Sequence, residues 1–389
     1  MSNVCILEKD LGVKFDVIDL TKDLIQRSSL TPYDAGCQDL LTERLAPLRF
    51  NVERFEFEGV QNLWARRGTA APLLVFVGHT DVVPTGPEAE WQSLPFSPTV
   101  RDNHLYGRGA ADMKGGIAAF IVALEHFIAE HPSHQGSVGL LLTSDEEGSG
   151  VNGVVRVVNE YLKKNQKVDY CLVGEPISDE WAGDTIKNGG RGVLNGKLVV
   201  QGVEGHVAYP QLAVNPIHRL VAPLAELCST EWDHGNAWFP ATSFQVTNIH
   251  AGNGTDNSIP GTVEASLNFR FSPESTVERL EAAVETILLR HKLDFHIEWK
   301  THGLPFLTKD GELLEAAKNA VFHTIGRAPR VSTMGGTSDG RHIATSFGAQ
   351  VVELGLVSKT IHKTDECVRI DDLEMLTVIY QRILENLLL

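Results

Sequence analysis

Short apolar segments alternate with stretches of helical periodicity along much of this 389-residue chain, and this alternation constrains its fold more than any other feature. Buried strands are predicted at Leu73–Val77, Val138–Thr143, Tyr170–Val173 and Gln350–Leu354, and helices at Gly115–Glu130, Val154–Leu162 and Leu373–Leu388. Apolar strands that alternate with helices are typical of largely parallel sheets buried on both faces. We therefore predict an α/β fold whose mostly parallel mixed sheet carries helices on both faces.

The middle of the chain follows a different pattern, in which apolar and polar residues alternate. Half-exposed antiparallel strands are predicted at Val193–Gln201, Thr242–Ile249 and Val263–Phe271, and helices at Pro216–Leu227 and Val277–His291. We expect residues 191–304 to form an inserted α+β domain of two layers. Residues 1–190 and 305–389 would then form one discontinuous domain around the parallel sheet.

The charge balance excludes several classes of partner. Basic residues number 34 against 50 acidic residues, which gives a net charge of −16. Such a surface repels phosphate backbones and anionic lipid, so we expect no nucleic-acid or membrane partner. The longest apolar run, around residues 117–124, is far shorter than the ~18 residues that cross a bilayer.

Cysteine usage and the first residues indicate the compartment. Five scattered cysteines form no C-x-x-C pair, which favours free thiols in a reducing environment. Residues 1–16 mix charged residues into their few apolar positions and lack the pattern of a secretory signal. We therefore expect a cytoplasmic protein.

Five separate strand or loop ends of the outer domain each carry a histidine or a carboxylate. They are His79, Asp112, Glu147, Glu175 and His362. Open α/β sheets form their ligand sites beyond the carboxyl ends of the strands, where residues distant in sequence converge. Two imidazoles and three carboxylates suit borderline divalent ions, above all zinc, with cobalt or manganese as substitutes. With one carboxylate shared, two ions ~3.5–4 Å apart would activate a water and polarise a carbonyl.

Local spacing suggests roles for the neighbours of these residues. Asp81 follows His79 at i+2, and in extended chain both side chains point to the same face, so Asp81 is expected to orient the imidazole. Glu146 and Glu147 are adjacent, and their side chains diverge in extended chain. We assign Glu147 to the metal and Glu146 to proton transfer.

The spacing alone leaves other interpretations open. A single histidine or aspartate at a strand end is more often a cap or a solvated loop residue, and Asp145–Glu147 alone is typical of a solvated turn. Gly335–Gly340 (GGTSDG) resembles an anion-binding loop, but short glycine-rich strings are weak signals. Residue patterns alone therefore do not decide between a binuclear metal hydrolase and an ordinary polar sheet edge.

Longer motifs carry a resemblance to a known family. Gly78–Gly86 (GHTDVVPTG), Tyr106–Gly115 (YGRGAADMKG) and Thr143–Gly148 (TSDEEG) resemble the aminoacylase/carboxypeptidase superfamily of dizinc enzymes. More narrowly, the chain is similar to the bacterial succinyl-diaminopimelate desuccinylase family at Gly205–Pro210 (GHVAYP), Thr242–Gln245 (TSFQ), Gly336–Arg341 (GTSDGR) and Thr360–Lys363 (TIHK). The similarity runs from about residue 16 to the C-terminus.

This resemblance implies a zinc-peptidase-like catalytic domain that hydrolyses N-succinyl-LL-2,6-diaminopimelate to succinate and LL-2,6-diaminopimelate, a step in lysine and peptidoglycan-precursor synthesis. It implies two Zn²⁺ per subunit, with Co²⁺ as a substitute. Asp112 would bridge the ions, His79 and Glu175 would complete one site, and Glu147 and His362 the other. Glu146 would move the proton from the attacking water to the leaving amine.

The same resemblance gives residues 191–304 the role of a dimerisation and lid domain. His206 would reach the oxyanion across the interface of a homodimer. A cis peptide bond is expected between Asp112 and Met113. Substrate carboxylates and polar groups would be held by a set of five residues, namely Arg191, Arg270, Tyr209, Asn257 and Thr337.

Two departures from the family pattern bear on the substrate. The chain has Gly190 and Val193 where the family usually has an arginine and a serine, so one guanidinium and one hydroxyl are missing. A related N-acyl-amino-acid deacylase, such as an acetylornithine deacetylase or an aminoacylase, is therefore the alternative. A catalytically silent binding scaffold is the third hypothesis.

Overall fold

The computed structural model describes residues 17–389, and the chain divides into two compact units. The first unit comprises the described residues up to Gly189 together with Leu307–Leu389, and the second comprises Gly190–Phe306. The chain passes between the units through β9 (Gly189–Gly190) and β16 (Phe306–Leu307). The expectation about a secretory signal concerns residues 1–16, which lie outside the described residues.

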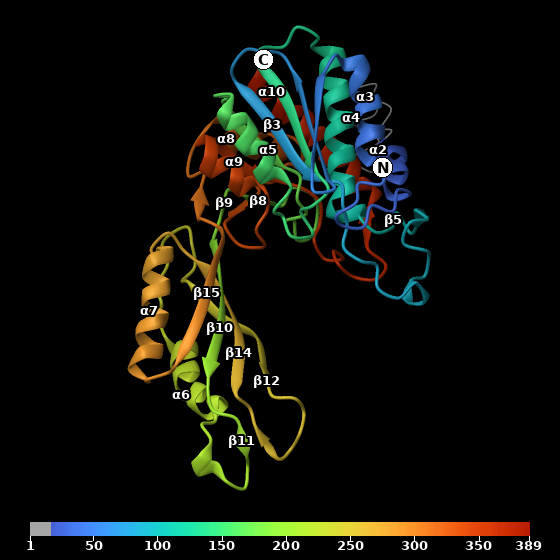
Figure 1. Ribbon diagram of the computed structural model, residues 1–389. Coiled ribbons are helices and arrows are strands. Elements are labelled where there is room, and N and C mark those ends of the chain that lie inside the picture. The colour runs from blue at the N-terminus through green and yellow to red at the C-terminus, as the bar shows by residue number, and fades with distance from the viewer. Residues whose placement is uncertain (1–16) are drawn as a thin grey trace. The chain divides into compact units, whose positions relative to one another are not determined.

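An eight-stranded mixed sheet organises the first unit (Figure 1). In spatial order its strands are β1 (Asn51–Phe57), β2 (Val60–Arg67), β6 (Ser137–Thr143), β3 (Leu73–His79), β7 (Tyr170–Val173), β18 (Gln350–Glu353), β8 (Thr185–Lys187) and β17 (Arg330–Ser332). The central strands β6, β3, β7 and β18 run parallel, whereas β1 and β2 are antiparallel additions at one edge. The prediction of a mostly parallel mixed sheet is confirmed.

Helices cover both faces of this sheet (Figure 1). One group contains α2 (Val17–Ile25), α3 (Cys37–Leu45), α4 (Gly115–Glu130), α8 (Glu312–Ile325) and α10 (Ile370–Leu388), and the other contains α5 (Val154–Lys163) and α9 (Gly340–Phe347). Every residue of β3 and β6 is buried, as their continuous apolar sequences require. Phe76 of β3 stacks on Phe120 of α4 with ring centroids 4.2 Å apart, and this contact packs α4 against the sheet.

A small three-stranded sheet extends the first unit near its functional loops. It consists of β4 (Thr99–Arg101), β5 (His104–Tyr106) and β19 (Cys367–Arg369). β5 leads into the turn Ala110–Lys114, which enters α4, and β19 follows the loop that carries His362. Tyr106 pairs with Cys367, so this sheet joins two loops that are far apart in sequence.

The second unit is a four-stranded antiparallel sheet with two helices. The strand order is β12 (Ser243–Ala251), β14 (Thr262–Phe271), β10 (Gly192–Gln201) and β15 (Phe295–Gly303), and the helices are α6 (Pro216–Ser229) and α7 (Val277–Arg290). Asn215 caps α6 and Thr276 caps α7 through their side-chain oxygens. Residues of β14 alternate between buried and half-exposed, and its buried face joins a core with Leu280 and Val284 of α7.

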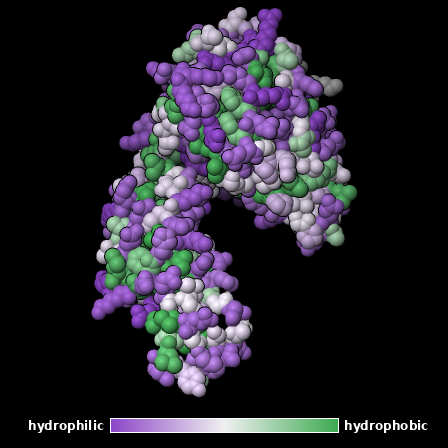
Figure 2. Space-filling view, in the orientation of Figure 1, coloured by the Kyte–Doolittle hydropathy of each residue, from purple (hydrophilic) through white to green (hydrophobic). Residues whose placement is uncertain are grey.

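Hydrophilic residues cover most of the visible surface of each unit, and smaller apolar patches interrupt them (Figure 2). Within residues 17–389, none of the helices combines the length and the apolar character needed to cross a bilayer. The four described cysteines are free thiols.

Candidate metal centre

Neighbouring strands of the first unit end at the same edge of the sheet, each followed by a candidate residue. β3 ends at His79, which pairs in register with Thr143 at the end of β6. Glu146 and Glu147 follow β6, and Glu175 follows β7, the parallel neighbour of β3. Because carboxyl ends of parallel strands meet at one edge, these side chains converge although they are distant in sequence.

Asp112 lies between two imidazoles. Its Oδ1 is 3.1 Å from Nε2 of His79, and its Oδ2 is 3.3 Å from Nε2 of His362. Oε1 of Glu147 lies 3.1 Å from the same nitrogen of His362, and Oε1 of Glu175 lies 3.7 Å from Nε2 of His79. The structure thus brings all five predicted metal ligands together, with one carboxylate facing both imidazoles. The peptide bond that follows Asp112 is cis.

A pocket of about 200 Å³ opens over this cluster. Its lining includes Asp112, Glu146, Glu147, Glu175, Thr337 and His362. Two groups of three side chains have ligand atoms within 4.8 Å of one another, one formed by His79, Asp112 and Glu147 and the other by His79, Glu146 and Glu175. Glu146 therefore lies as close to the cluster as the predicted ligands themselves.

The donor set fits divalent cations. Nδ1 of His79 is hydrogen-bonded to the main-chain oxygen of Asp81 at 2.8 Å, which makes Nδ1 the protonated nitrogen of a neutral ring. The lone pair on Nε2 then faces a carboxylate oxygen of Asp112 at 3.1 Å. Two acceptors at this distance require a cation or an added proton between them. Imidazole nitrogens and carboxylate oxygens around a shared carboxylate suit zinc or a similar metal.

The same crowding of charge shifts the pKa values of the cluster. Burial would lower the pKa of His79, but the hydrogen bond to Asp112 and the charge of Glu175 raise it well above its ordinary value. Burial would raise the pKa of Asp112, yet hydrogen bonds from His362 and His79 lower it to about 2. Burial, with the negative charges of Asp339, Glu147 and Asp112, raises the pKa of Glu146 to about 8. Bound cations would stabilise such a site, because they offset the repulsion among its buried carboxylates.

Asp81 differs from its predicted role in one respect. We expected its carboxylate to orient the His79 ring, but that carboxylate is 3.8 Å from Nδ1, and the main-chain oxygen of Asp81 makes the hydrogen bond instead. β3 ends at His79, so the same-face argument for extended chain does not hold beyond it. The fully buried carboxylate accepts the main-chain N–H groups of Glu146 and Glu147 at 3.3 and 3.2 Å. It therefore orients the two glutamates.

Three predicted site residues lie together in the second unit. His206 ends the short strand β11 (Gly205–His206), which pairs with β13 (Ser258–Ile259). The exposed ring of Tyr209 lies 5.9 Å from the ring of His206, and the main-chain oxygen of Asn257 accepts the N–H of Val207. Nδ1 of His206 accepts the N–H of Ala208 at 3.0 Å, so its Nε2 carries the proton and is a donor.

Arg191 and Arg270 form a second group in this unit. Arg191 is half-buried just before β10, and Arg270 pairs with Val193 across β10 and β14. Burial, together with the positive charge of Arg270, lowers the pKa of Arg191. The two guanidinium groups repel each other, and a carboxylate bound between them would offset this repulsion.

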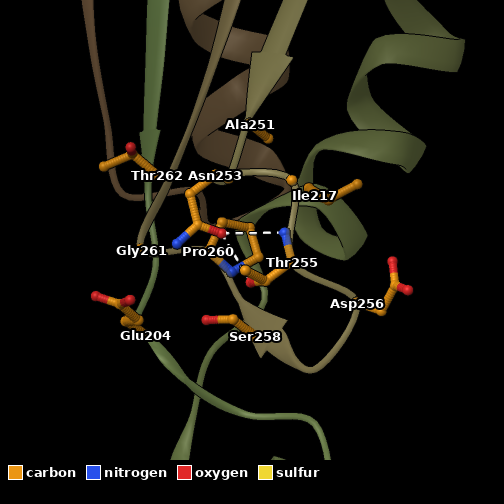
Figure 3. Close-up of a pocket in the computed structure, with 12 residues that line it drawn as sticks. Glu204, Ile217, Ala251, Asn253, Thr255, Asp256, Ser258, Pro260, Gly261 and Thr262 are labelled. Atoms are coloured by element: carbon orange, nitrogen blue, oxygen red, sulfur yellow. Dashed lines mark hydrogen bonds between the residues drawn. The ribbon is translucent and has the colours of Figure 1, made fainter.

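A larger hollow of the second unit lacks this chemistry. It measures about 470 Å³ and is lined by the loop that connects β12 and β13, together with Glu204 and Ile217 (Figure 3). Glu204 and Asp256 contribute carboxylates, but no histidine or cysteine lies among the described residues that line it. Its size alone therefore does not make it a reaction site.

A third group of metal-type side chains lies outside the pocket. Glu130, His131 and Glu385 meet at the ends of α4 and α10. The amide of Gln381 donates to both carboxylates, at 3.1 and 3.0 Å. These acids thus have a donor of their own, and the group is not a candidate centre.

Comparison with known proteins identifies the family. Residues 75–386 match the model of peptidase family M20/M25/M40. The chain belongs to this family. An M20 metallo-carboxypeptidase of Sulfolobus solfataricus shares the fold with a TM-score of 0.82 and 18% identity, over 96% of this chain and 99% of the other.

Two relatives of this M20 protein are much more similar in sequence. A succinyl-diaminopimelate desuccinylase of Methylobacillus flagellatus is 55% identical over 371 residues, which are 95% of this chain and 99% of that protein. A succinyl-diaminopimelate desuccinylase of Thioalkalivibrio sulfidiphilus is 55% identical over 373 residues, 96% and 99% of the two chains. With the side-chain cluster, this membership makes the protein a metal-dependent amidohydrolase.

Other charged residues in and near the pocket were not predicted from the sequence. Glu353 ends β18 and lines the pocket, where its carboxylate is bonded to Lys187 and to the hydroxyl of Ser338. A carboxylate at the end of a predicted strand was a usable signal for Glu353. Nothing in the local sequence indicates the burial of Lys187.

Proposed function

We propose that the protein hydrolyses the N-succinyl amide of N-succinyl-LL-2,6-diaminopimelate to succinate and LL-2,6-diaminopimelate. The observation that carries this proposal is the 55% identity to two desuccinylases over almost the whole of both chains. Such similarity extends over both units of this chain.

In this proposal two Zn²⁺ ions would share Asp112 as a ligand. His79 and Glu175 would hold one ion, and Glu147 and His362 would hold the other. The two oxygens of Asp112, each facing a different imidazole, support this division. When bound, the ions polarise the amide carbonyl and make the attacking water more acidic, and Co²⁺ substitutes for Zn²⁺.

Glu146 moves the proton. Its carboxylate lines the pocket, and the N–H of Glu146 is held by Asp81, which aims the side chain. Glu146 accepts a proton from the water whose oxygen bonds to the succinyl carbon. It then gives that proton to the diaminopimelate nitrogen as the amide C–N bond breaks, so the products are succinate and a free amine.

His206 donates a hydrogen bond to the oxygen that gains negative charge during this attack. The Nε2–H group supports this role, because a developing oxyanion is stabilised by a hydrogen-bond donor that is already in place. We propose that His206 reaches the site of a partner subunit, so that residues 191–304 act as a dimerisation and lid domain. β12 is an edge strand, and Val207, Ile217, Val221 and Ile249 expose 39–61% of their surface in the same unit.

Substrate carboxylates bind Arg191 and Arg270, with Tyr209, Asn257 and Thr337 as hydrogen-bond partners. The mutual repulsion of the two guanidinium groups supports an anion at this point. The reducing cytoplasm is the proposed compartment, and the free cysteines support it.

A related N-acyl-amino-acid deacylase is the second candidate, because Gly190 and Val193 remove a guanidinium and a hydroxyl that the resemblance leads us to expect. The deciding experiment compares kcat/KM for N-succinyl-LL-2,6-diaminopimelate and for N-acetylornithine with the metal-loaded protein. We expect a strong preference for the succinyl substrate. A ratio of one or below would favour an acetylornithine deacetylase, and no hydrolysis of any acyl amino acid would favour a silent scaffold.

A further inference from the structure

A buried ion pair lies beneath the metal centre of the first unit. Nη1 of Arg108 is 2.7 Å from Oε2 of Glu366, and the two side chains are only 2% and 1% exposed. Neither residue lines the pocket described above. A buried pair is a poor source of stability, since apolar side chains of similar volume often stabilise a protein as well. The pair therefore invites another explanation.

Glu366 binds the main chain of the turn that carries Asp112. Its Oε1 accepts the N–H groups of Ala111 and Asp112, at 2.9 and 3.0 Å, and its Oε2 accepts the N–H of Gly109 at 3.0 Å. Gly109 has a φ of 85°, and a Cβ there would lie 2.8 Å from Val82, so the turn admits only glycine at this position. The carboxylate thus determines the path of the main chain up to Asp112.

Arg108 binds two further segments of the site. Besides Glu366, its guanidinium donates to the main-chain oxygen of Lys363 at 3.2 Å and to that of Pro84 at 3.3 Å. Lys363 directly follows His362, and Pro84 lies three residues after Asp81. The main-chain N–H of Gly107 also donates to the carbonyl of Glu366 at 2.9 Å. One side chain therefore connects the segments of His79, Asp112 and His362.

We infer that Arg108 and Glu366 form a positioning pair, which holds Asp112 so that its two oxygens face the two imidazoles. The inference rests on the proposed metal centre. Three converging N–H groups and a guanidinium require an acceptor with two charged oxygens. A glutamine at position 366 would supply one acceptor and turn an NH₂ group toward a donor, so at least one of these hydrogen bonds would be lost.

The test is Glu366→Gln, with metal binding as its main measurement. Metal-free protein is titrated with Zn²⁺ by calorimetry, and the absorption spectrum of the Co²⁺ form reports ligand geometry without any substrate. We expect affinity for at least one ion to fall about 10–100-fold, the usual effect of removing a residue that orients a ligand, together with an altered Co²⁺ spectrum. The kcat should fall by a similar factor with little change in KM.

Asp184→Asn is the matched control. The Asp184 carboxylate also accepts three main-chain N–H groups, those of residues 179–181, but it lines none of the pocket. Metal affinity and the Co²⁺ spectrum should be unchanged in this variant even if its thermal stability falls. A Glu366→Gln protein with wild-type metal affinity and spectrum would overturn the inference, whatever its melting temperature.

Arg108→Lys keeps the test decisive if Glu366→Gln does not fold. Lysine retains the charge beside Glu366, but its single ammonium cannot reach the carbonyls of Lys363 and Pro84 at the same time. We expect weaker metal binding here too, and unchanged affinity would again refute the positioning role. Wild-type protein that binds no ion would instead refute the proposed metal centre, so the two failures are distinguishable.

Discussion

Glu146 is assigned to proton transfer and Glu147 to metal binding, and substituting each residue separately tests the proton transfer by itself. The two residues are adjacent, both line the pocket, and each belongs to a group with metal-binding geometry. In the proposed account only Glu147 is a ligand, because its Oε1 lies 3.1 Å from Nε2 of His362. Glu146→Gln should therefore strongly reduce turnover and spare metal binding, whereas Glu147→Gln should weaken metal binding and lose turnover as a consequence.

The size of the Glu146→Gln effect follows from what the variant retains. The main-chain N–H of residue 146 still donates to Asp81, and the two oxygens of Asp112 still face the two imidazoles. Only the proton acceptor is lost, and a positioned acid–base group contributes about 10²–10⁴-fold to a rate. We thus expect kcat to fall by that factor, which is about 2.7–5.4 kcal/mol in the barrier.

The raised pKa of Glu146 strengthens this expectation. Burial and the surrounding carboxylates raise its pKa to about 8 in the metal-free protein, so it is mostly protonated at neutral pH. Nearby cations lower the pKa of a carboxyl group, which makes Glu146 available as a base only when the site is loaded. A glutamine side chain cannot become a base in this way, because it does not lose a proton when the site is loaded.

Steady-state kinetics and metal analysis of the same preparations provide the assay. Two ions per chain should remain in Glu146→Gln, whereas Glu147→Gln should retain fewer at micromolar metal. Glu146→Gln protein that keeps its turnover, or that loses an ion while Glu147→Gln loses none, would refute the assignment.

Three further predictions concern the second unit. His206→Ala should lower kcat about 10²–10³-fold with little change in KM, measured on the succinyl substrate, because its hydrogen bond strengthens as the oxyanion forms; a rise in KM alone would contradict that. Arg191→Ala should raise KM for that substrate about 10–100-fold through the loss of a charged hydrogen bond, and an unchanged KM would remove Arg191 from the site. Burial would raise the pKa of Asp233, but hydrogen bonds from Thr242 and Ser275 hold it well below its usual range. The stabilising effect of Asp233 is therefore present above about pH 4 and is lost as the pH falls. The free energies of unfolding of wild type and Asp233→Asn, measured in urea, should converge at low pH, and a constant difference between them would contradict this.

Elements with strong local signals could be predicted closely from the sequence. α4 spans Gly115–Glu130 and β7 spans Tyr170–Val173, as predicted, because α4 repeats apolar residues at helical spacing before Pro132 and β7 is a short apolar segment before Gly174. β1 and β2 were missed. They form a hairpin through Glu58 and Gly59, both with positive φ, and their mixed polar sequences become strands through pairing with each other and with β6.

Chemistry-bearing residues at strand ends were predictable for the same reason. His79, Glu147 and Glu175 follow apolar strands, and the rule for open α/β sheets brings such positions together. Glu366 was not predictable, because the segment Lys363–Glu366 reads as a solvated turn. Its burial depends on Arg108, which lies 258 residues away along the chain. Local sequence carries no signal for a partner at that separation.

The most direct test of the central claim is to count metal ions and measure hydrolysis on one preparation of the protein. Purified protein should bind two Zn²⁺ per chain and hydrolyse N-succinyl-LL-2,6-diaminopimelate, lose turnover on chelation, and recover it when Zn²⁺ or Co²⁺ is returned. Undiminished hydrolysis by thoroughly chelated protein would contradict the claim that Asp112 and its partners work by holding metal.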